Sequence, residues 1–67
     1  MKRQQFEECT GRIADAIRMA MDLAEGSVQA EDCVRDLAGT TARQFSQAAG
    51  WSEDKKNEWF KRAGFPR

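Results

Sequence analysis

The chain has 67 residues, of which 40% are hydrophobic, 33% charged and 9% aromatic. A length below the usual ~100 to 200 residues predicts a single small domain over 1–67, whose thin core favours self-association or a partner. Eleven basic and eleven acidic residues give zero net charge, and no histidine is present. This composition argues against a strongly charged nucleic-acid or membrane binder, a histidine-based catalytic dyad and imidazole metal ligands.

The amino-terminal segment and the two cysteines bear on the compartment. No apolar segment follows Lys2 and Arg3, so the sequence predicts neither a signal peptide nor a membrane-spanning helix. Cys9 and Cys33 lie far apart and have no histidine partners, which argues against a zinc site. We expect a cytoplasmic protein with both thiols reduced and buried as small apolar side chains, and we expect no cofactor.

Apolar residues recur every three or four positions between residues 6 and 24, which predicts a first helix over about 4–24. The stripe consists of Phe6, Cys9, Ile13, Ala16, Ala20 and Leu23, flanked by Ile17 and Ala24. Glu8 and Arg12 form the favoured acid-then-base pair at i,i+4. The sequence Glu25-Gly26-Ser27 then marks the end of this helix.

A second helix is predicted over about 28–49, because Ser27 is a suitable N-cap and apolar residues again recur every three or four positions. Its stripe consists of Ala30, Val34, Leu37, Thr41, Phe45 and Ala48. Glu31 and Arg35 supply another i,i+4 pair. Gly39 is a weak point, and the capping-box pattern that begins at Thr41 leaves open a helix that breaks here.

A third, short helix is predicted over about 53–63, with Ser52 as its N-cap and Gly64 and Pro66 as stop signals. About three residues join the two longer helices, so these must lie antiparallel. The predicted fold is all-α: an antiparallel helical hairpin plus a short C-terminal helix. Opposite residues of this hairpin have numbers that sum to about 51 or 52.

That register has two consequences. It sets Cys9 and Cys33 roughly 15 Å apart along the hairpin axis, too far for a disulfide bond. It also brings Gly11 near Gly39, which predicts a close crossing of the two helices, unless the glycines are tolerated helix defects.

No group of residues points to catalysis. Two acidic pairs at helical spacing, Asp15 with Asp22 and Asp32 with Asp36, are interleaved with arginines, which is typical of a solvated, ion-paired face. The glycines occur singly, so no phosphate-binding loop is present in the sequence. We therefore expect no catalytic residue and no enzyme activity.

Aromatic and basic residues concentrate near the C-terminus. Both tryptophans, Trp51 and Trp59, fall within the last seventeen residues, and residues 40–67 carry six basic and three acidic side chains, a net charge of +3. Adjacent residues on a helix cannot both face one core, so either Trp59 or Phe60 is a candidate interface anchor. Alternatively, Trp51, Phe60 and Phe65 pack as a lid on the hairpin. The candidate partner-binding residues are Trp59, Phe60, Lys55, Lys56, Arg62, Met19 and Met21.

We interpret the chain as a small non-catalytic protein-binding module: a regulator, adaptor or inhibitor of a larger protein. We expect it to form a homodimer through exposed faces of its helical hairpin, with no membrane partner. Met19 and Met21 support this interpretation, because they lie off the main stripe of the first helix and need cover.

The alternative interpretation is nucleic-acid binding through residues 41–63. Residues 45–52 contain an apolar residue, two alanines, a turn glycine, an apolar residue and a capping serine, and they resemble the first helix and turn of a helix-turn-helix of the mercury-resistance-regulator type. Residues 60–65 resemble its exit, although the interval from Gly50 to Gly64 is one residue longer and Lys56 occupies an expected buried position. The resemblance implies a surface of Lys55, Lys56 and Asn57 for the major groove, with Arg43 and Arg62 for the phosphates.

Overall fold

The computed structural model describes residues 2–65, which form three helices and no strand. Helix α1 spans Arg3–Leu23, α2 spans Val28–Ala49 and α3 spans Glu53–Arg62. The predicted all-α hairpin with a short C-terminal helix is confirmed, and every predicted helix boundary lies within one residue of the observed one. The expected stop signal at Pro66 and the basic Arg67 lie outside the described residues.

Local hydrogen bonds explain where the helices begin and end. The hydroxyl of Ser27 accepts from the backbone N–H of Ala30 at 3.3 Å, and that of Ser52 accepts from Lys55 at 3.2 Å. Both serines are therefore the predicted N-caps. Gly50 ends α2 in the left-handed conformation, with φ at 65°, where a side chain would be strained.

Helix α2 continues through Gly39, so the alternative with a broken second helix is wrong. Apart from its chain neighbours and the nearby backbone of α2, no atom lies within 4 Å of the place where a side chain on Gly39 would begin. Gly39 therefore lowers helix propensity but does not mark a close helix crossing. At Gly11 the space is occupied by the guanidinium of Arg62, so the predicted close helix crossing at Gly11 and Gly39 is wrong.

Two of the expected ion pairs have different outcomes. Arg12 and Glu8 pair at 2.9 Å, as predicted. The predicted pair between Glu31 and Arg35 is wrong, because Arg35 pairs instead with Asp32 at 3.0 Å. The Glu31 carboxylate accepts from the backbone N–H at residue 26, at 3.4 Å, and so belongs to the turn that precedes α2.

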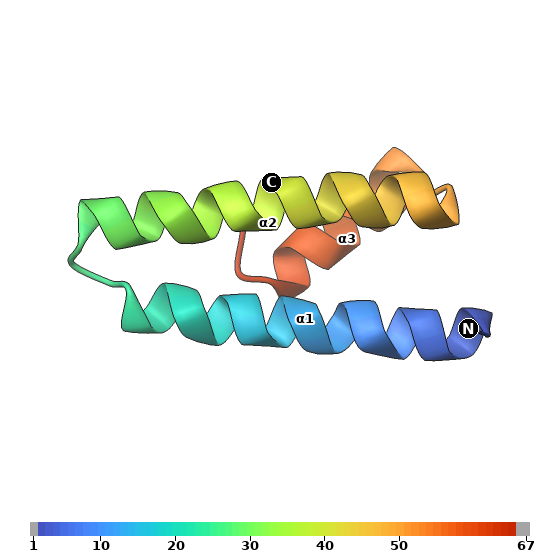
Figure 1. The fold of residues 1–67 in the computed structure, drawn as a ribbon, viewed down its shortest axis with the longest axis horizontal. Coiled ribbons are helices and arrows are strands. Elements are labelled where there is room, and N and C mark those ends of the chain that lie inside the picture. Colours follow the sequence, from blue (N-terminus) through green and yellow to red (C-terminus); the bar gives the residue numbers. More distant parts are fainter. Residues whose placement is uncertain (1, 66–67) are drawn as a thin grey trace.

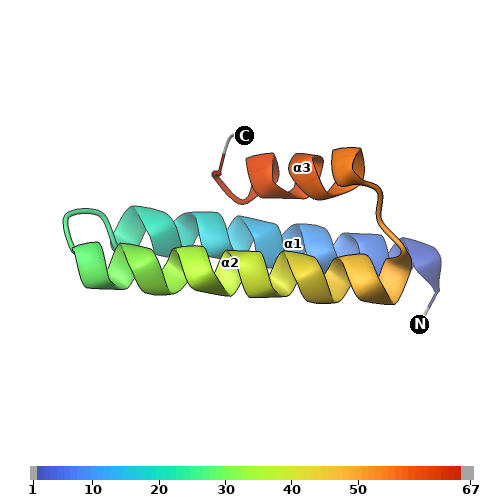
Figure 2. The same cartoon turned by 90° about the horizontal axis from the view of Figure 1, so that it is seen from above.

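The hairpin of α1 and α2 forms one layer and α3 forms the second (Figures 1 and 2). The two long helices run antiparallel, and α3 turns back after residue 50 to lie along one side of the hairpin, in contact with both long helices. The core lies between these layers and consists of Ala14, Ile17, Ala38, Ala42, Trp59, Phe60 and Ala63. Trp51 and Phe65 pack against this core, which agrees with the lid expected from the sequence.

The side of α1 that becomes buried differs from the predicted stripe. Thr10, Ala14 and Ile17 are buried, because α3 packs over this side of the hairpin. Leu23 is 88% exposed and Leu37 is 55% exposed, although both belong to the predicted stripes. Periodicity alone cannot distinguish two adjacent apolar rows of a helix, and the arrival of α3 decides which of them is covered.

The cysteines lie on the surface. Cys9 and Cys33 are free thiols and both are exposed. The prediction that they are buried as small apolar side chains is therefore wrong. Each lies on the side of its helix that faces away from α3: Cys9 belongs to the predicted stripe of α1, and Cys33 lies beside that of α2.

Candidate interaction surface

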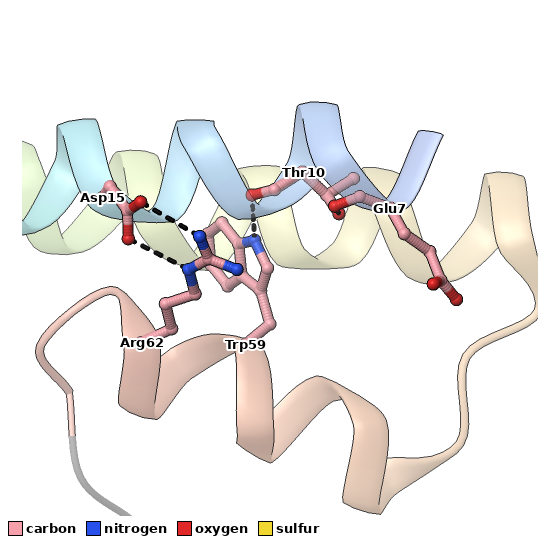
Figure 3. Close-up of polar contacts among 5 residues, drawn as sticks. All are labelled: Glu7, Thr10, Asp15, Trp59 and Arg62. Carbon is pink, nitrogen blue, oxygen red and sulfur yellow. Dashed lines mark hydrogen bonds and ion pairs between the residues drawn. The ribbon is translucent and has the colours of Figure 1, made fainter. Parts of the chain in front are cut away.

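Trp59 fixes α3 to α1. Its indole N–H donates to the carbonyl oxygen of Thr10 at 2.8 Å (Figure 3), and its ring meets the ring of Phe45 edge-on, with centroids 5.8 Å apart. Trp59 is 5% exposed and Phe60 is 6% exposed. The prediction that one of them is an exposed anchor is wrong, because α3 lies against both long helices and can bury two adjacent positions.

Arg62 provides a second link between α3 and α1. Its Nε and one terminal nitrogen donate to the two carboxylate oxygens of Asp15, at 2.9 and 3.0 Å (Figure 3). The guanidinium lies over Gly11, where a side chain would come within 2.8 Å of its central carbon. The hydrogen bond from Arg62 holds the pKa of Asp15 below its ordinary value, and the same bond raises the pKa of Arg62.

The two lysines predicted to bind a partner lie on the first half of α3. Lys56 pairs with Glu53 at 3.0 Å. Lys55 lines a broad open hollow at the end of the hairpin, together with Phe6 and Trp51. Of the basic side chains that the helix-turn-helix resemblance assigns to nucleic acid, Lys56 and Arg62 are therefore engaged in ion pairs within the chain.

The two methionines differ in their surroundings. Met19 is exposed near the loop end of α1, and Met21 is half-buried. Exposed aliphatic side chains also surround this end of the hairpin, among them Leu23 and Val28. Leu23 belongs to the predicted stripe of α1, and that stripe was not among the candidate partner-binding residues.

The side of the hairpin opposite α3 carries two rows of uncharged residues. On α1 this row comprises Cys9, Ile13, Ala16, Ala20 and Leu23, and on α2 it comprises Ala30, Val34, Leu37, Thr41, Gln44 and Ala48. All of these residues are exposed or half-buried in the structure. We call this surface the uncharged face. No described element of the chain covers it (Figure 2).

The distribution of charge sets this face apart. At about 3.6 residues per turn, every acidic and basic residue of α1 and α2 falls on the other rows of these helices. Glu8 and Arg12 mark the edge of the face on α1, where they border a shallow hollow floored by Ile13 and Ala16. In a chain that is 33% charged, a two-helix surface with no charged residue is unusual.

No protein family model, curated protein or solved structure matches this chain. Within residues 2–65, no helix is long and apolar enough to cross a membrane, and no three acidic or cysteine side chains gather into a group that could hold a metal ion. The candidate surface must therefore be judged by its own residues.

Three features of the uncharged face make it the candidate interaction surface. It is apolar, it spans both long helices, and large side chains on it, such as Leu23 and Leu37, are exposed to solvent. A sequence signal for it exists: the steps of three and four along each row contain no charged residue. That signal predicts an apolar face, but it does not tell whether α3 or another chain covers it.

Proposed function

We propose that this chain is a non-catalytic protein-binding module, a regulator, adaptor or inhibitor, that binds through the uncharged face. The observation that carries the proposal is the exposure of an apolar face, with Leu37 at its centre, on a helical hairpin that α3 covers only from the other side. Exposed apolar patches of this kind mark protein interfaces, because water contact with the apolar surface is unfavourable.

The thin core supports the same proposal. No large side chain is completely buried among the described residues, and alanines make up most of the buried hydrophobic positions. A chain of this length gains little stability from its own core, so cover over a second apolar face adds a large fraction of the total.

The experiment is capture of partners by the tagged full-length chain from a native lysate, with and without nuclease treatment. Two aspartate variants on α2 separate the face from the rest of the surface. Leu37→Asp places a charge in the uncharged face, where Leu37 is 55% exposed. Val28→Asp is the control, because it replaces a more exposed aliphatic residue, 73% exposed, in a row that also carries Asp32 and Arg35.

We expect nuclease-resistant protein partners that are retained by Val28→Asp and lost with Leu37→Asp. Equal capture by the two variants would move the binding site away from the uncharged face. Recovery of nucleic acid, with every bound protein lost after nuclease, would instead support the predicted helix-turn-helix alternative over residues 41–63.

A further inference from the structure

We infer that a second copy of this chain covers the uncharged face, so that two hairpins form a four-helix bundle with the α3 of each copy on the outside. The inference rests on the proposed function and names the partner that occupies its binding face. The direction of the apolar rows, the dimensions of the hairpin, the charge of the face and the register of the two helices support a second copy as the occupant.

The direction of the rows fits the core of a bundle. Their steps of three and four are the spacing of residues that point to the axis of a coiled coil or four-helix bundle. Ile13 and Val34 are half-buried where α1 meets α2, whereas Leu23 and Leu37 lie toward the open side. Each row thus points between the neighbouring helix and the uncovered side, which is where the centre of a four-helix bundle would lie.

The hairpin is large enough to carry an interface of standard size. The chain measures 38 Å along the hairpin and 19 Å across it. The outline of the whole hairpin is therefore about 700 Å², of the same order as the roughly 800 Å² that each partner buries in an interface of standard size, and the uncharged face lies within this outline.

The charge distribution favours a second copy. When a two-fold axis brings a surface against itself, any charged residue near the axis meets its own like charge, and an uncharged face avoids this penalty. Exposed alanines such as Ala16 alternate along α1 with larger residues such as Ile13 and Leu23. Ridges of one copy can therefore enter grooves of the other.

The register of the hairpin selects the orientation. The rings of Phe6 and Phe45 meet at 5.8 Å, so residues with numbers summing to about 51 lie at one level. If the two-fold axis runs along the bundle, α1 packs on α2 of the second copy. The residues that then face each other again have numbers that sum to about 51, as they do within one hairpin. Glu8 then faces Arg43 of the second copy, and Arg12 lies within about one turn of Asp36.

The opposite orientation lacks these pairs. If the loops lay at opposite ends of the bundle, α1 would pack on α1, and Arg12, near the middle of that helix, would meet Arg12 of the second copy. We therefore assign the arrangement with both loops at the same end, because opposite charges then line the edges of the interface.

The test is the mass of the full-length chain in solution, measured by light scattering and sedimentation from about 1 to 200 µM. We expect twice the 7.6 kDa of one chain for the wild type and for Val28→Asp. Leu37→Asp should weaken dimerisation by at least about 100-fold, because each dimer would bury two unpaired carboxylates. Ala16→Glu, at an exposed helical position, is a second variant that should also weaken the dimer and should leave the monomer folded, which circular dichroism checks.

Two further readouts sharpen the test. Cys9 lies on the face, so its thiol should react slowly with a maleimide in the wild-type dimer and rapidly in Leu37→Asp or Ala16→Glu. Arg43→Glu should weaken the dimer, and the added substitution Glu8→Arg should restore it. Loss without restoration would overturn the orientation with loops together.

A wild-type chain that stays monomeric at 200 µM, with Cys9 equally reactive in all variants, would overturn the inference. Capture from lysate then distinguishes failure of the proposed dimer from failure of the proposed protein-binding function. If Leu37→Asp still loses a partner that Val28→Asp retains, a different protein occupies the face and only the second copy is excluded. If neither a dimer nor a face-dependent partner is found, the proposed function fails as well.

Discussion

Replacing Trp59 with phenylalanine should destabilise the chain by about 2 kcal/mol. The substitution removes the buried hydrogen bond to Thr10, which contributes about 1 kcal/mol net. The smaller ring also leaves part of a site that is now 5% exposed unfilled, and the lost burial and packing cost about 1 kcal/mol more. A chain of 67 residues has a total stability of about 3 to 10 kcal/mol, so this loss is a large fraction of it.

The assay is thermal and urea unfolding followed by circular dichroism at one fixed protein concentration. A loss of about 2 kcal/mol should lower Tm by roughly 10 °C in a domain of this size. Trp51→Phe is the matched control, because that indole is partly exposed and should change Tm far less. If Trp59→Phe melts with the wild type, or if Trp51→Phe loses as much, then the contact with Thr10 does not hold α3 on the hairpin.

The glycine within α2 and the glycine that ends it should respond to alanine in opposite directions. Gly39→Ala should stabilise the folded chain by up to about 1 kcal/mol, because the position is helical and open. Gly50→Ala should destabilise it by about 1 kcal/mol, because the φ of Gly50 is positive. Urea unfolding of both variants checks the two signs. The pKa of Asp15 is lowered by Arg62, so this ion pair contributes stability above the carboxyl's ordinary pKa, and the contribution is lost as the pH falls through the lower folded value. In Asp15→Asn the free energy of unfolding should therefore fall less steeply at acid pH than in the wild type. The measurement is the free energy of unfolding from pH 2 to 7, and equal slopes for the two proteins would contradict the prediction.

The sequence was sufficient for the elements and their ends. Ser27 and Ser52 have the hydroxyl groups that cap α2 and α3, and Gly50 has the freedom that ends α2, so local chemistry determines these boundaries. The same local rules gave weight to a break at Gly39, which does not occur. One glycine costs about 1 kcal/mol, and the packing on either side of it outweighs that cost.

The candidate surface was harder to predict for a geometric reason. α1 has two adjacent apolar rows, one through Ala14 and one through Ala16, and both fit a helical period. The position of α3 covers the first row, and this depends on long-range contacts such as Trp59 with Thr10. Because aromatic residues are common in interfaces, the sequence-based interpretation chose Trp59 and Phe60 as partner-binding residues, but both are core residues. It did not choose Leu37, which is exposed.

The buried alanines of the hairpin and of the end of α3 constrain how the sequence can vary. Ala14, Ala38, Ala42 and Ala63 are each at most 1% exposed, and the bulky rings of α3 rest among them. A larger residue at any of these positions would displace the rings and cost about 1 to 3 kcal/mol through overpacking. In a library that randomises every alanine and selects for folded chains, these four positions should accept only residues of alanine size or smaller, while the exposed Ala49 should vary freely.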